Sequence, residues 1–204
     1  MADNVETNFK GIWVRPGGSN RNLLQEVNAA LARINSTVSG RLLLSGIAED
    51  GRLLQGTYKV VIVSPTHYTP TNCTRAANEI HARRTAVARG QGTTSGIFWN
   101  SSTTATPDGE RPSFIGLAHE LIHAWRNMLG ITNADPNEDE GETVGLLRPP
   151  SPPPRTDSRG RNMKRQTVTE NDIRVEHGLA PRTSYWMGIH GAVPHEWQHL
   201  VGLF

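Results

Sequence analysis

The stretch from Ser113 to Leu129 combines an apolar helical pattern with two histidines, His119 and His123. Its apolar residues cover most of the circumference of a helix, which predicts a buried helix rather than an amphipathic surface helix. Gly130 follows as a natural C-terminal stop. Histidines in such an apolar setting are costly unless they have partners. The apolar positions are Phe114, Ile115, Leu117, Ala118, Leu121, Ile122, Trp125 and Leu129.

These two histidines frame an HExxH motif, "HELIH". Residues four apart lie on the same face of a helix, so His119 and His123 can offer two imidazole nitrogens to one metal ion. Zinc takes such nitrogens at about 2.0–2.1 Å. Glu120 lies next to that face and can act as general base toward a water bound by the metal. The motif therefore predicts a catalytic Zn²⁺ site.

The third protein ligand of this zinc site is not part of the motif. A catalytic zinc needs three protein ligands and an open position for water. The extended pattern HExxHxxGxxH is absent, because the helix continues as "AWRNMLG". The acidic run "ADPNEDEGETVGLL" is the obvious source of a third ligand. Composition alone leaves four candidates open, namely Glu138, Asp139, Glu140 and Glu142.

A second HExxH motif, "HEWQH", lies at residues 195–199. Pro194 suits the start of a helix, but only five residues follow His199, and no acid remains downstream to complete a metal site. We therefore expect a surface or packing role for this motif. The alternative is that His195 or His199 lines a substrate cleft without binding metal.

The totals of the chain exclude several classes of protein. A length of 204 residues fits one domain over 1–204. A net charge of +2, without a basic and aromatic stripe, argues against nucleic-acid binding. The single cysteine, Cys73, excludes an internal disulfide and a Cys-rich zinc site. There is no apolar run of about 18 residues to span a membrane. The N-terminus "MADNVETNFK" lacks a signal peptide, so export requires a non-classical route.

Periodicity and turn residues predict the remaining elements. Apolar residues at helical spacing predict a helix that starts at Ser19 or Asn20 and reaches Ile34. Residues 1–18 are expected to be loosely ordered up to "GIWV", and the Pro/Arg-rich segment 148–165 to be an exposed loop. The other expected elements are strands at 41–48, 58–64 and 96–100, a helix or helix pair over 71–88, and regular structure again from 167.

Three separated stretches resemble one group of enzymes. "LAHELIHA", "EGETVG" and "TENDIRVEHGLAPRTSY" are similar to the active-site framework of the clostridial neurotoxin light chains. They resemble still more closely that of the NleD-like bacterial effector zinc metalloproteases. The resemblance covers about residues 113–186. It implies a compact α+β zincin-type domain, with a small mixed sheet, an N-terminal helix packed on it and a central HExxH helix. In zincins an edge strand before that helix commonly pairs with substrate, which would be the strand at 96–100.

The resemblance also implies roles for individual residues. The Glu-x-x-Thr-x-Gly pattern in "EGETVG" selects Glu140 as the third zinc ligand, with Glu142 as the alternative if the register shifts. Asp139 matches an acid that supports a ligating histidine. Arg182 and Tyr185 match an Arg-x-x-Tyr pair that assists the transition state, and a glutamate twelve residues earlier matches Glu170. A guanidinium and a phenol directed at the developing oxyanion stabilise the transition state more than the ground state.

The resemblance implies a zinc endopeptidase that is a virulence effector, such as a type III effector. It would be delivered into the host cytoplasm to cut signalling proteins such as mitogen-activated protein kinases. A secretion chaperone and a monomeric state are expected. An interbacterial protease toxin is a second version of this reading. The competing class is a non-catalytic binding protein with a structural zinc, in which "RPPSPPPR" docks a partner.

Overall fold

The computed structural model of the chain describes residues 3–17, 20–53, 58–64, 72–106, 109–156, 162–163 and 165–185. The second HExxH motif, at 195–199, lies outside the described residues. No helix in the described part of the chain is long and apolar enough to cross a membrane.

The sheet is small and mixed, as expected. Its five strands lie in the order β1-β2-β3-β5-β4. The three inner strands β2, β3 and β5 run parallel, while β1 and β4 pair antiparallel at the two edges. All residues of β3 and β5 are buried. The strands are β1 (Val5–Glu6), β2 (Ile12–Val14), β3 (Val60–Val63), β4 (Cys73–Ala76) and β5 (Ser95–Phe98).

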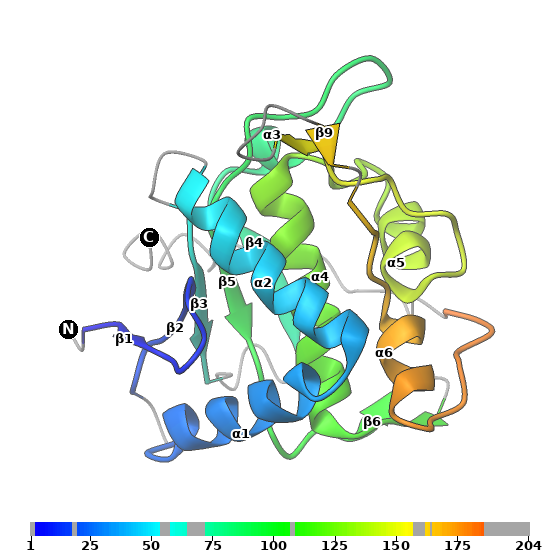
Figure 1. Cartoon of the computed structure of the whole chain (residues 1–204). Coiled ribbons are helices and arrows are strands. Elements are labelled where there is room, and N and C mark those ends of the chain that lie inside the picture. The colour runs from blue at the N-terminus through cyan, green and yellow to red at the C-terminus, as the bar shows by residue number, and fades with distance from the viewer. Residues whose placement is uncertain are drawn as a thin grey trace.

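Helix α4 (Ser113–Leu129) is the centre of the fold. It has the bounds predicted from its apolar pattern, and every residue from Phe114 to Leu129 is buried. Gly130 ends it in the left-handed conformation, with φ of 66°. The helix packs on β4 and β5 on one side and on α1 (Leu23–Asn35) and α2 (Val38–Leu53) on the other (Figure 1). The histidines of α4 are therefore held in the middle of the molecule.

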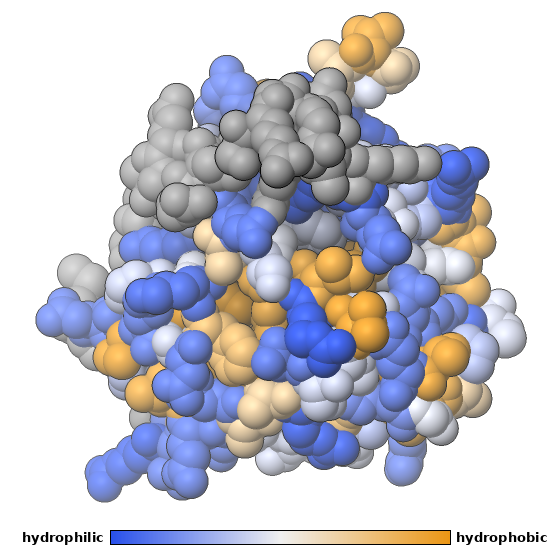
Figure 2. Space-filling view, viewed as in Figure 1, coloured by the Kyte–Doolittle hydropathy of each residue, from blue (hydrophilic) through white to orange (hydrophobic). Residues whose placement is uncertain are grey.

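Helix α2 forms the outer layer over α4. Figure 2 shows a face that is mostly hydrophilic, with small hydrophobic patches across its middle, in the area that α2 occupies in Figure 1. Val38 and Leu42 of α2 are exposed, whereas Leu43 and Ile47 are fully buried. Helix α2 is thus amphipathic and shields the active-site helix from solvent on this side.

Two short helices and two hairpins complete the site region. Asp135 caps α5 (Pro136–Val144) by accepting hydrogen bonds from the backbone of Asn137 and Glu138. Thr169 and Asp172 form a capping box at the start of α6 (Glu170–Glu176). The other elements are α3 (Glu79–Ala82) and the hairpins β6 (Ala105–Thr106) with β7 (Gly109–Glu110) and β8 (Arg155–Thr156) with β9 (Asn162–Met163).

The strand predicted at 41–48 is wrong, because these residues belong to α2. Leu43 and Ile47 are four residues apart and both are fully buried, which is helical spacing. Gly46 lies between them and lets α2 approach α4 closely, since a Cβ there would stand 2.6 Å from the ring of Trp125. The short apolar run concealed a helical period.

The helix predicted over 71–88 is also mostly wrong. Only Glu79–Ala82 is helical, and Cys73–Ala76 forms the edge strand β4. Because β4 pairs with β5, the predicted strand at 96–100, observed as Ser95–Phe98, lies inside the sheet rather than at its edge. The edge strand beside α4 is therefore β4.

Two segments expected to be loose or exposed contribute to the packed structure. Residues 3–17 contain β1 and β2, and Ile12 and Val14 are fully buried because β2 pairs with β3. Within the Pro/Arg-rich segment, Pro152 is buried and lines a small cavity with Trp125 of α4. Helix α1 begins at Leu23, and no side chain caps its N-terminus.

Candidate metal centre

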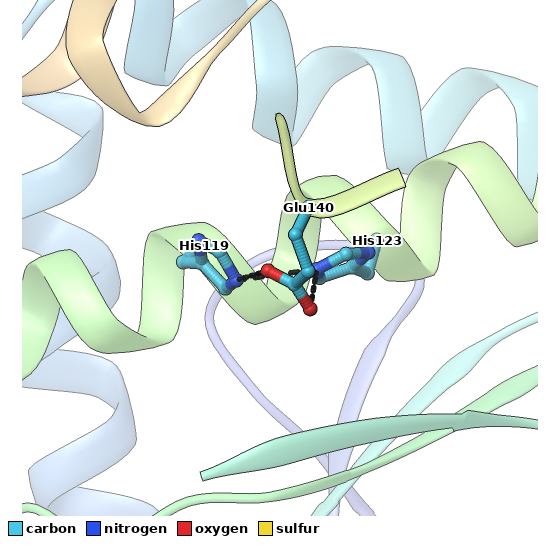
Figure 3. A group of neighbouring side chains, drawn as sticks. All are labelled: His119, His123 and Glu140. Atoms are coloured by element: carbon cyan, nitrogen blue, oxygen red, sulfur yellow. Dashed lines mark hydrogen bonds and ion pairs between the residues drawn. The ribbon is translucent and has the colours of Figure 1, made fainter. Parts of the chain in front are cut away.

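His119 and His123 lie one turn apart on α4 and are both buried. Their Nε2 atoms are 3.1 Å apart, and their rings meet edge to face. Figure 3 shows both rings directed toward one point beside the helix. The helical geometry expected from the HExxH spacing therefore brings the two Nε2 atoms together.

Glu140 of α5 completes this group. One of its carboxylate oxygens lies 3.0 Å from Nε2 of His119, and the other lies 3.3 Å from Nε2 of His123 (Figure 3). The three potential ligand atoms lie within 4.8 Å of one another. Within the described residues this is the one such group of histidine and acidic side chains.

The other acids of the run point elsewhere. Glu142 pairs with Arg84, at 2.6 Å, and with Arg126. Glu138 is exposed and accepts a hydrogen bond from Asn133 at 2.8 Å. Of the four candidates, Glu140 alone reaches both Nε2 atoms, so the geometry agrees with the choice that the family resemblance implied.

Arg126 fastens α5 to α4, and the sequence analysis did not identify it. Its guanidinium is buried and donates to the backbone oxygen of Asp139 at 3.1 Å and to Oγ1 of Thr143 at 2.9 Å. It also pairs with the carboxylates of Asp139, at 3.0 Å, and Glu142. An arginine three residues after His123 in an otherwise apolar helix was the available signal. This anchor sets the position of Glu140.

Carboxylates on the outer side of the rings orient both histidines. Nδ1 of His123 lies 2.9 Å from Oδ2 of Asp139, and Nδ1 of His119 lies 2.8 Å from Oε2 of Glu170. A carboxylate accepts, so each Nδ1 donates, and each Nε2 keeps its lone pair for the inner side. Asp139 thus lies where the resemblance placed it, and Glu170 proves to contact His119 directly.

Glu170 is also the meeting point of three arginines. Its carboxylate is fully buried and lies 3.3 Å from Arg111, 3.3 Å from Arg182 and 3.2 Å from Arg174. Although burial alone raises the pKa of Glu170, His119 and the arginines lower it to about 2. Glu170 is therefore ionised at neutral pH. Arg111, which precedes α4, was not identified from the sequence.

Arg182 and Tyr185 stand on the same side as these groups. The Tyr185 ring is parallel to that of His119, with centroids 6.1 Å apart, and the Arg182 guanidinium lies 4.6 Å from the Tyr185 ring centroid. Burial, and then the charge of Glu140 and a hydrogen bond with it, raise the pKa of Tyr185. The phenol therefore keeps its proton at neutral pH and can donate a hydrogen bond.

The electrostatics at the Nε2 atoms favour a cation. Burial alone lowers the pKa of His119 and His123, but the charge of Glu140 outweighs it and raises both. The histidines in turn hold the pKa of Glu140 well below its usual value, against the effect of burial. One oxygen of Glu140 is buried without a hydrogen-bond donor in the described structure. Two imidazole nitrogens and a carboxylate that converge in this way fit a divalent metal ion.

The family model for Peptidase M91, described as an effector protein family, matches residues 15–185. The chain belongs to this family. Membership confirms the resemblance to NleD-like effector proteases and makes the protein a metalloendopeptidase with a protein substrate. For an M91 effector it also implies delivery into host cells. No curated protein matches the chain in sequence.

Solved structures show the same fold. The catalytic domain of Clostridium botulinum neurotoxin serotype F superposes with a TM-score of 0.55 and 12% identity, over 88% of this chain and 79% of that one. A serotype F light chain gives 0.46 and 12%, over 81% and 54%. The botulinum neurotoxin type G light chain gives 0.43 and 17%, over 60% and 45%. This M91 peptidase therefore has the zincin-like fold of the neurotoxin catalytic domain, as predicted.

Proposed function

We propose that this peptidase is a zinc-dependent endopeptidase with His119, His123 and Glu140 as its metal ligands. The observation that carries the proposal is the convergence of three electron-pair donors on one point, beside a glutamate that follows the first histidine. The donors come from two helices that Arg126 locks together. A zinc ion held there would act as a Lewis acid toward a water and toward the scissile carbonyl.

Glu120 is the general base and acid of the proposed mechanism. It is buried on α4 next to His119. Its carboxylate takes a proton from the attacking water and later delivers it to the nitrogen of the leaving amine. Asp139 and Glu170 keep the two histidine rings in the orientation that directs Nε2 inward.

Arg182 and Tyr185 stabilise the oxyanion that forms at the attacked carbonyl. Both groups keep their protons at neutral pH and stand beside His119. Hydrogen bonds from a guanidinium and a phenol strengthen as negative charge develops, and removal of one such donor typically costs roughly 10²- to 10³-fold in kcat.

The proposed biological role is that of a single-domain, monomeric virulence effector. It would leave the bacterium by a non-classical route, such as type III secretion with a chaperone, and act in the host cytoplasm. Mitogen-activated protein kinases are the substrate class that the resemblance to NleD-like proteases implies. Membership in a peptidase family disfavours the alternative of a non-catalytic docking protein with a structural zinc.

The direct test compares zinc-loaded wild type with Glu120→Gln. Each protein is incubated with a eukaryotic cell lysate and, separately, with purified mitogen-activated protein kinases, and new N-termini are identified by mass spectrometry. Glu138→Gln is the matched control, because Glu138 is an exposed acid of α5 that contacts Asn133 instead of the histidines. We expect new N-termini with wild type and the control but none with Glu120→Gln, which keeps its zinc. Cleavage that persists in Glu120→Gln contradicts the proposal.

A further inference from the structure

Thr74, on the edge strand β4, contacts the Glu120 carboxylate directly. Its hydroxyl donates to Oε2 of Glu120 at 2.8 Å and lies 2.9 Å from the backbone oxygen of the same residue. The two residues are 46 positions apart in sequence. The hydroxyl therefore links the carboxylate to the backbone of its own helix.

The strand register explains why Thr74 points at α4. Thr74 is paired with Ile97 of β5, and directly opposed residues of an antiparallel pair project to the same face. Ile97 belongs to the main core beneath α4, whereas the neighbouring pair Cys73 and Phe98 belongs to a small cluster on the other face. A shift of one residue in β4 would turn the hydroxyl away from Glu120.

This hydroxyl is the one hydrogen-bond donor to the Glu120 carboxylate among the described residues. A carboxylate offers about four lone-pair positions, so one threonine fixes its orientation and leaves the others free for water. Arg182 and Tyr185, by contrast, contact Glu170 and His119. The position of the general base thus depends on an edge strand rather than on the rest of the metal centre.

We propose that Thr74 is the positioning residue for Glu120, and this proposal rests on the proposed function of Glu120 as the general base. The hydroxyl holds the carboxylate in one orientation beside the two histidines. Thr74 touches neither the ligands nor the oxyanion donors in the described contacts. Its loss should therefore lower turnover while leaving metal binding and substrate affinity intact.

The test uses three zinc-loaded variants of the full chain. Thr74→Val removes the hydroxyl at nearly constant shape, and Thr74→Ser retains it. Thr132→Val is the matched control, because the Thr132 hydroxyl donates to Asn127 of α4 at 2.7 Å, away from Glu120. The substrate is a peptide that spans the cleavage site identified in the lysate experiment, and zinc per chain is measured for each variant.

We expect kcat of Thr74→Val to fall roughly 10- to 100-fold, as is typical for groups that orient the residues of a metal site. KM should stay within about twofold of the wild-type value, since substrate contacts are intact. Thr74→Ser and Thr132→Val should both resemble wild type. Wild-type turnover in Thr74→Val, no rescue by Thr74→Ser, or an equal loss in Thr132→Val would each overturn the proposal.

Crystal structures of metal-free wild type and Thr74→Val provide a readout that does not depend on activity. The proposal predicts that the Glu120 carboxylate leaves its wild-type position in Thr74→Val. An unmoved carboxylate overturns it. If wild type cuts nothing but the carboxylate moves in Thr74→Val, the proposed peptidase mechanism fails and the positioning contact stands.

Discussion

Nδ1 of His119 lies 2.8 Å from the carboxylate of Glu170, across 51 residues of sequence. The same carboxylate pairs with Arg182, which lies against Tyr185. One buried acid thus joins a metal-ligand candidate to the groups that face the oxyanion. Changes at Glu170 should therefore affect both metal affinity and catalysis.

Glu170→Gln removes this charge at almost constant shape. We expect zinc affinity to fall roughly 10- to 100-fold, because His119 loses the ionised acceptor that orients its ring. Competition with a chromogenic chelator measures the affinity. Glu176→Gln, on the same helix, is the control, since Glu176 binds Ser39 at the start of α2. An unchanged zinc affinity in Glu170→Gln would refute the role of the acid.

Arg126→Met should destabilise the metal-free protein by about 3–5 kcal/mol, because it leaves buried carboxylates without their partner. Asp139 and Glu142 are the acids concerned. Urea denaturation measures the free energy of unfolding. Arg83→Met serves as the control, since Arg83 forms an exposed ion pair with Glu79, and such pairs contribute about 0–1 kcal/mol. Equal losses in the two variants would show that Arg126 is not the anchor of α5.

Zinc binding should release protons, and its affinity should rise with pH. In the metal-free protein Glu140 outweighs burial and raises the pKa of His119 and His123 above 6.5, whereas a metal needs both Nε2 atoms unprotonated. Calorimetry in buffers of different ionisation enthalpy counts the protons released. The prediction fails if no proton is released between about pH 6 and 7.

The same raised pKa values have the opposite effect on the stability of the metal-free protein. A folded-state pKa above the unfolded value of 6.5 means that the folded protein binds protons more tightly. This contribution to stability is complete below pH 6.5 and is lost as pH rises through the folded-state pKa. Denaturation of metal-free protein at a series of pH values should show that decline, and His119→Gln should reduce it.

Metal removal should lower the melting temperature without unfolding the protein. Helix α4 is buried among apolar residues of α1, α2 and the sheet, so the fold does not depend on an ion alone. Zinc in thousandfold excess over its Kd would add about 4 kcal/mol. Circular dichroism with and without a chelator measures both effects. A chelated protein that loses its helical signal would instead support a structural zinc.

The sequence was informative where the pattern was local and continuous. The apolar run ending at Gly130 predicted the bounds of α4, and the HExxH spacing predicted that His119 and His123 meet. The short run at 41–48 was ambiguous, since Leu43 and Ile47 suit a strand or a buried helix until their partner Trp125 is known. The strand β4 is polar and short, and its pairing with β5 creates it.

Long-range contacts explain the site residues that were missed. Composition left four acids open as the third ligand, and the choice of Glu140 required the family resemblance. Arg126, Arg111 and Thr74 carry no motif of their own. Their importance appears only when folding brings them to Asp139, Glu170 and Glu120, respectively. Spacing in the sequence could not reveal these contacts.

The central claim is that the first HExxH motif and Glu140 hold a single zinc ion. Zinc per chain should be measured for wild type, Glu140→Ala and the double variant His195→Ala/His199→Ala, with folding checked by circular dichroism. The account predicts one zinc in wild type and in the double variant, and its loss in folded Glu140→Ala. Zinc that stays in Glu140→Ala but is lost from the double variant would contradict the account and assign the metal to the second motif.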